Sequence, residues 1–275
     1  MNVATNITMR SVLYCLLGGS SLTIATAGAG HFGWWWLSGV VLSAAFLPVA
    51  RFGPRGWWMQ FGVILPCLFV VGSLCTASEV WVFFPGLRWT VKQDIVGGFV
   101  MYTIAAVVLA SLAKLLKLTD EREGMGEHRS LWAAGGMVLL SGFAYVVYYL
   151  IFGSITYNMF TRQYYPGGAD LARSMGIVFW LIELARGILM TLAVVPVIYT
   201  LRMRRWPAAI VVGVLVWVVG GLAPLLVPNE LLGPTQRFIH TIEILTQNVS
   251  LGVTAVLLLR PARRGVLSAQ LPVVG

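Results

Sequence analysis

Residues 176–199 read GIVFWLIELARGILMTLAVVPVIY, an apolar run that is long enough to cross a lipid bilayer as one helix. An α-helix rises about 1.5 Å per residue, so a bilayer core of about 30 Å takes roughly 20 mostly apolar residues. Only Glu183 and Arg186 carry charge in this run. The stretch therefore predicts a transmembrane helix with two charged side chains inside the membrane.

The same pattern recurs along the whole chain. Of its 275 residues 58% are hydrophobic and 11% are charged, whereas soluble domains carry roughly 25% charged residues. We therefore expect an all-α integral membrane bundle, a single domain over residues 1–275, with four spans on each side of a polar break. The eight predicted spans are residues 11–30, 33–50, 57–80, 95–116, 131–153, 176–199, 207–227 and 239–259.

The basic residues predict the orientation of this bundle. If successive spans alternate in direction, thirteen of the 19 Lys and Arg residues fall on one side, five fall on the other, and Arg186 lies within a span. Loops rich in Lys and Arg stay in the cytoplasm. We expect both termini to be cytoplasmic in a multi-pass protein of the cell inner (plasma) membrane.

The N-terminus has an alternative interpretation. Arg10, the apolar run after it and the small residues at 25–30 resemble a cleavable signal peptide, and cleavage would leave seven spans. Because the charge alternation holds with this segment retained, we expect it to remain as the first span.

Several classes of partner and cofactor are not expected. The net charge of +9 is distributed by loop, as in membrane proteins, so we expect the lipid bilayer as a partner and no nucleic acid. The three cysteines lie in apolar runs without a CxxC pair, and His240 with Glu243 supplies only two ligands at a spacing of three. The chain also lacks the Walker, nucleophile-elbow and HExxH motifs. We expect no metal and no cofactor.

Charged side chains inside the membrane are the candidates for chemistry, because each costs at least about 2.5 kcal/mol to insert. Glu183 and Arg186 are three residues apart, so they share one helix face and can form an ion pair. The alternative is that this pair is a structural salt bridge that ties the sixth span to a neighbour.

A second polar face lies in the eighth span. His240, Glu243 and Gln247 are spaced by three and four residues, and Asn248 borders them. The sixth and eighth spans both enter from the predicted non-cytoplasmic side, so the two charged faces can meet as a binding or proton-relay site. The alternative is that His240 and Glu243 lie so near the helix start that water reaches them.

Other residues are expected to surround such a site. Glu79 and Asp94 lie at the same end of the third and fourth spans and are candidates for a vestibule above it. The tyrosines 145, 148 and 149 either line a pocket or, as we expect, belong to the aromatic belt at the membrane surface. We interpret residues 154–170 as a polar loop. Pro66, Pro196 and Pro224 lie within spans and predict kinks.

Three hypotheses for function remain. The first is a small-solute or proton-coupled transporter, in which the charged groups of the sixth and eighth spans form an outward-facing site. The second is an intramembrane enzyme or binding protein for a lipid-soluble substrate, with His240 and Glu243 as general acid and base and Arg186 holding an anionic headgroup. The third is a structural subunit of a larger membrane complex. The ligand and the oligomeric state stay open.

Overall fold

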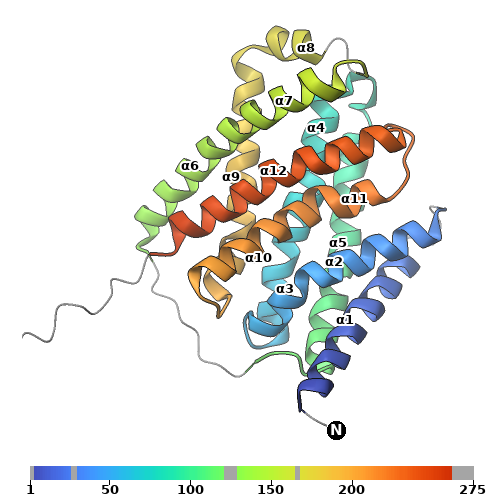
Figure 1. Cartoon of the computed structure of the whole chain (residues 1–275), viewed down its shortest axis with the longest axis vertical. Coiled ribbons are helices and arrows are strands. Elements are labelled where there is room, and N and C mark those ends of the chain that lie inside the picture. Colours follow the sequence, from blue (N-terminus) through green and yellow to red (C-terminus); the bar gives the residue numbers. More distant parts are fainter. Residues whose placement is uncertain (1–2, 26–29, 121–128, 165–167, 262–275) are drawn as a thin grey trace, which may run out of the picture.

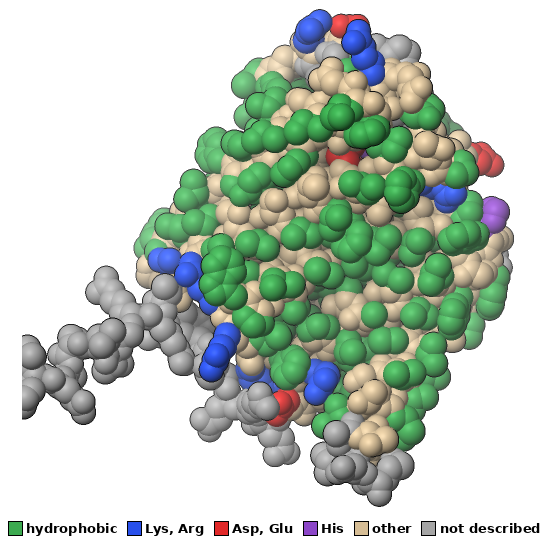
Figure 2. Space-filling model, viewed as in Figure 1, with side chains coloured by type: hydrophobic (Ala, Val, Ile, Leu, Met, Phe, Trp, Pro, Cys, Tyr) green, Lys and Arg blue, Asp and Glu red, His purple; other side chains and the backbone are tan. Residues whose placement is uncertain are grey.

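The computed structural model describes residues 3–25, 30–120, 129–164 and 168–261, and within these segments the chain folds into helices joined by short turns. Eight of the helices in the described part are long and apolar enough to cross a membrane. Figure 1 shows them packed side by side in one bundle, and Figure 2 shows the broad hydrophobic surface that the bundle presents. The predicted helical membrane bundle is confirmed.

The spans follow one another with short connections. The first two are α1 (Val3–Ala25) and α2 (Phe32–Phe52), and the third is continuous through α3 (Trp57–Pro66), η1 (Cys67–Leu74) and α4 (Cys75–Phe83). After the short turn η2 (Pro85–Leu87), the fourth is α5 (Val91–Leu115). The fifth comprises α6 (Leu131–Tyr148), η3 (Tyr149–Gly153), α7 (Ser154–Thr156) and η4 (Tyr157–Thr161). After α8 (Gly168–Met175) come α9 (Ile177–Thr200), then α10 (Arg205–Trp217) with η5 (Val218–Leu222) and α11 (Ala223–Leu226), and finally α12 (Pro234–Leu259).

Several of these elements differ from the prediction. The first span, predicted from residue 11, is helical from Val3. The fifth span continues as helix to Thr161, so the loop predicted over residues 154–170 is wrong in its first half. The eighth span begins at Pro234 rather than near residue 239, because proline suits the first helical position and the Gln236 side chain accepts a hydrogen bond of 2.7 Å from the Gly233 N–H. His240 is therefore the seventh residue of its helix, and not the second.

Wider, π-helical turns interrupt three of the spans. They occupy η1 in the third span, η3 and η4 in the fifth, and η5 in the seventh. Pro66 directly precedes η1 and Pro224 closely follows η5, so two of the predicted kink sites lie next to altered helix geometry. Pro196 differs, since it lies inside the α-helix α9, where the Thr200 hydroxyl donates to its carbonyl.

Small residues let the helices approach closely, as membrane bundles require. A side-chain carbon added at Gly252 of α12 would lie 2.5 Å from the Cα of Gly213 in α10, which is too close to accommodate. A carbon added at Gly187 of α9 would lie 2.7 Å from the Cβ of Tyr145 in α6. The second contact sets the distance between α9 and α6, the helices that carry Arg186 and Tyr145.

One end of the bundle, here called the basic end, is fastened by arginines. Arg260 is buried, and its guanidinium donates to the carbonyls of Ile198 at 2.6 Å and Met203 at 2.9 Å, and also to that of Leu201. Figure 1 shows the end of α12 beside the starts of α6 and α10. Further bonds at this end run from the Arg129 side chain to the Leu258 carbonyl, from the Arg202 N–H to the Phe52 carbonyl and from the Asp120 N–H to the Arg51 carbonyl.

Candidate functional site

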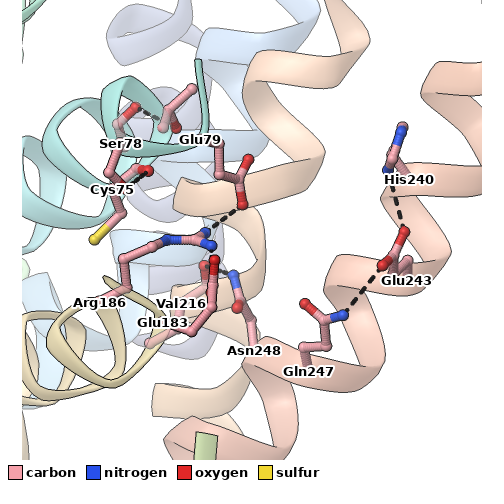
Figure 3. Close-up of polar contacts among 12 residues, drawn as sticks. Cys75, Ser78, Glu79, Glu183, Arg186, Val216, His240, Glu243, Gln247 and Asn248 are labelled. Carbon is pink, nitrogen blue, oxygen red and sulfur yellow. Dashed lines mark hydrogen bonds and ion pairs between the residues drawn. The ribbon is translucent and has the colours of Figure 1, made fainter. Parts of the chain in front are cut away.

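The centre of the candidate site is an arginine held between two carboxylates, here called the buried cluster of Glu79, Glu183 and Arg186. Arg186 donates from Nη1 to Oε2 of Glu183 at 2.7 Å, one turn earlier on α9. It also donates from Nη2 to Oε1 of Glu79, which α4 supplies from the third span. Figure 3 shows the guanidinium lying between the two acids. The cluster therefore joins the third and sixth spans.

The cluster is largely removed from solvent. Glu183 is 1% exposed and Arg186 is 6% exposed, whereas the side chain of Glu79 is 35% exposed. The ring of Tyr145 covers Arg186, with its centroid 5.8 Å from the guanidinium carbon, so it adds a cation–π contact. With both acids ionised, one positive and two negative charges leave the cluster at −1, and one bound proton makes it neutral. A buried net charge is costly, so this group is suited to binding a proton.

A small cavity lies beside the cluster. Its lining includes Glu79 and Arg186 on one side and Gln247 and Asn248 of α12 on the other. Its volume is about 10 Å³, which is room for one water molecule. The buried Nε of Arg186, a residue that lines this cavity, has no hydrogen-bond partner among the described residues.

The wall opposite Arg186 carries the polar face of α12. Asn248 is buried and donates to the Val216 carbonyl at 3.3 Å. Gln247 is buried and donates to Oε1 of Glu243 at 3.2 Å, and Oε2 of Glu243 lies 3.1 Å from Nδ1 of His240 (Figure 3). The two polar faces predicted from the sequence thus converge on one cavity, through Gln247 and Asn248.

The wider helical turns surround this cavity. Val71 of η1 and Gly220 of η5 contribute to its lining, and Cys75 and Thr76 follow directly after η1. Such turns leave gaps in the regular backbone pattern and occur often at functional sites. Within a membrane they are tolerated where they are buried in protein or line a cavity, as they do here.

The two acids predicted for a vestibule lie in different places. Glu79, predicted only for a vestibule, lies in the cluster itself. Asp94 is exposed in the first turn of α5, where Oδ2 accepts from the Thr90 hydroxyl at 2.8 Å, and it does not line the cavity. Its carboxylate is well placed to stabilise the start of that helix.

The tyrosines also differ from expectation. The prediction of a membrane-surface belt is wrong for Tyr145, which is buried against Arg186. The hydroxyl of Tyr148 is 2.7 Å from that of Thr254 on α12, so this residue also contacts the bundle interior. The sequence does not show whether these tyrosines lie at the membrane surface or in the bundle interior, because the packing of a neighbouring helix decides which.

No group of three His, Cys, Asp or Glu side chains in the described residues is placed to hold a metal ion. The described part of the site therefore consists of ionisable and amide side chains around a water-sized cavity. Comparison of the chain with protein-family models, with curated proteins and with solved structures found no match.

Proposed function

We propose that the protein is a proton-coupled membrane transporter that also passes its coupling proton when no other solute is present, and that the buried cluster binds this proton. The observation that carries the proposal is a single arginine between two carboxylates, next to a cavity with room for one water. Such a group changes between −1 and neutral when one proton binds. Intramembrane carboxylates of this kind are typical of proton relays and coupled transporters.

The size of the cavity favours a proton over a larger ligand. Pockets for small organic ligands measure roughly 300 Å³ or more, whereas this cavity is about 10 Å³. An intramembrane enzyme acting on a lipid-soluble substrate would need such a pocket beside its acid and base. The cavity in this conformation has the right size for a proton and the water that delivers it.

The proposal includes a direction of access. The basic end, which arginines fasten to helix carbonyls, would lie in the cytoplasm of the inner membrane, as the positive-inside pattern predicts. The exposed edge of Glu79 would then face the opposite side. In this conformation the proton site would be reached from the non-cytoplasmic end, while the basic end stays closed.

Proton movement in proteoliposomes tests the proposal. Vesicles with the reconstituted protein, a trapped pH dye and a high internal potassium concentration are diluted into potassium-free buffer, and valinomycin then lets potassium leave and makes the inside negative. We expect acidification faster than in protein-free vesicles. Glu183→Gln should lose this difference, because the amide keeps the shape of the side chain but cannot ionise.

Glu230→Gln is the matched control, since Glu230 is an exposed acid in the connection between α11 and α12. It should keep the wild-type rate. A wild-type rate equal to that of protein-free vesicles would overturn the proposal, and so would a Glu183→Gln rate equal to the wild-type rate.

A further inference from the structure

Three side chains on one face of α12 form a hydrogen-bonded series, here called the α12 stripe of His240, Glu243 and Gln247. Nδ1 of His240 lies 3.1 Å from Oε2 of Glu243, and Nε2 of Gln247 lies 3.2 Å from Oε1 of the same carboxylate. Figure 3 shows the series running along the helix toward Asn248 and Arg186. Each member is one turn from the next, so the three groups form a continuous polar line within an apolar bundle.

The stripe goes from partly exposed to buried. The side chain of His240 is 26% exposed and that of Glu243 is 14% exposed, while Gln247 is 3% exposed. The exposed member is nearest to the helix start, and the buried member lines the cavity with Arg186. A path from water to a buried site requires such a gradation.

The fifth span packs against the stripe. A side-chain carbon added at Gly153 of η3 would lie 3.5 Å from Oε1 of Glu243 and 3.7 Å from Nε2 of Gln247. The α12 helix also packs against η3 and η4. The stripe therefore faces another helix of the protein, at ordinary van der Waals distance from Gly153.

We propose that the α12 stripe is the entry route by which a proton reaches the buried cluster. This inference rests on the proposed function. His240 takes a proton from outside water and passes one from Nδ1 to Oε2 of Glu243. Glu243 gives it to water near Gln247, and from that water a carboxylate of the cluster takes it. One proton moves at each step, and nothing is oxidised or reduced. After each transfer the proton that His240 took from water lies on Nε2, so a flip of the imidazole ring restores the hydrogen at the position facing Glu243 before the next transfer.

Gln247 is a positioning residue in this scheme. Its amide nitrogen holds Glu243, and in Figure 3 its oxygen points toward the side of Asn248 and Arg186. It thus fixes the carboxylate and offers an acceptor to a cavity water. The ionisable groups that face the route from the other elements are Cys75 and Glu79 on α4, Glu183 and Arg186 on α9, and Tyr145 and Tyr149 on the fifth span.

The competing route is direct access of water to Glu79, whose side chain is the most exposed of the cluster. The two routes predict different variants to be slow. If the stripe carries the proton, Glu243→Gln and His240→Ala reduce the rate of acidification by about a hundredfold, the scale of a lost proton-transfer group. If water reaches Glu79 directly, both variants keep the wild-type rate.

The experiment uses the full-length protein in the same dye-loaded proteoliposomes, with Glu230→Gln as the control. External imidazole at millimolar concentration is added to each variant, because a small diffusible base can replace a missing histidine in a relay. We expect imidazole to restore His240→Ala and to leave Glu243→Gln and Glu183→Gln unchanged. Wild-type unfolding curves for the three variants in detergent would confirm that they are folded.

The outcomes separate the two proposals. Loss of transport in Glu183→Gln together with full rates in Glu243→Gln and His240→Ala overturns the entry route and leaves the proposed function standing. A slow His240→Ala that imidazole does not restore also overturns the route, because it assigns the histidine a structural role. Wild-type rates in Glu183→Gln overturn both.

Discussion

Arg186 and Arg260 are both buried arginines in a membrane bundle, but the groups that hold them differ. Arg260, at the basic end, donates to backbone carbonyls at the ends of helices. Arg186 donates to the carboxylates of Glu79 and Glu183. Carbonyl oxygens do not take up protons at physiological pH, whereas carboxylates do. The first arrangement can only fasten the helices, and the second can also change its charge.

The largest expected effect is on the cluster. Replacing Arg186 by Met leaves two acids without their counter-ion, which costs about 3–5 kcal/mol for a buried pair. We expect the free energy of unfolding in detergent to fall by this amount. The triple variant Glu79→Leu, Glu183→Leu and Arg186→Met should recover most of it, because a well-packed apolar replacement removes the charges together.

The triple variant also sharpens the comparison, since it should be stable and inactive in the proteoliposome assay. An Arg186→Met protein as stable as the wild type would show that the cluster is not held by its charges.

A smaller effect is expected at the basic end. Arg260→Met leaves the carbonyls of Ile198, Leu201 and Met203 without their donor, and the unfolding free energy should fall by about 3 kcal/mol. The proton flux per folded molecule should stay unchanged, because no carboxylate of the buried cluster is lost. Lys92→Gln, an exposed cation at the other end, is the control and should change stability by less than about 0.5 kcal/mol. Altered proton flux in a folded Arg260→Met protein would contradict a purely structural role.

The smallest effect is expected where α9 and α6 pack closely together. A methyl group at Gly187 would lie 2.7 Å from the Cβ of Tyr145, so α6 must move away from α9. We expect Gly187→Ala to lower the unfolding free energy by about 1–2 kcal/mol, within the range for overpacking. Gly62→Ala is a matched control, since a carbon there meets nothing within 4 Å. Equal stability of the two variants would show that this contact does not position the cluster.

The sequence predicts the number and apolar character of the spans well, because hydropathy over 20 residues is a strong constraint in a bilayer. It misplaces the start of α12, since its first turns, including Gln236 and Arg237, are polar and do not register as membrane-spanning. It likewise ends the fifth span too early, where Ser154 and Asn158 interrupt the apolar pattern.

The site is predicted only in part, for a different reason. Glu183, Arg186 and the α12 stripe follow from spacing within one helix, which periodicity describes. Glu79 is harder to assign, because its contact with Arg186 joins the third span to the sixth, and the sequence of one span does not show which neighbour it meets. The contact between Tyr145 and Arg186 depends on a neighbouring helix and has no local pattern.

The segment η1 has one further consequence for Glu79. Each residue of an α-helix turns the chain by about 100°, and the wider turns of η1 shift the angular phase of everything that follows, including Cys75 and Glu79. Rewinding this segment into regular α-helix would rotate the end of the third span about the helix axis. The Glu79 carboxylate would then swing out of reach of Arg186 while the helix on either side stayed wound.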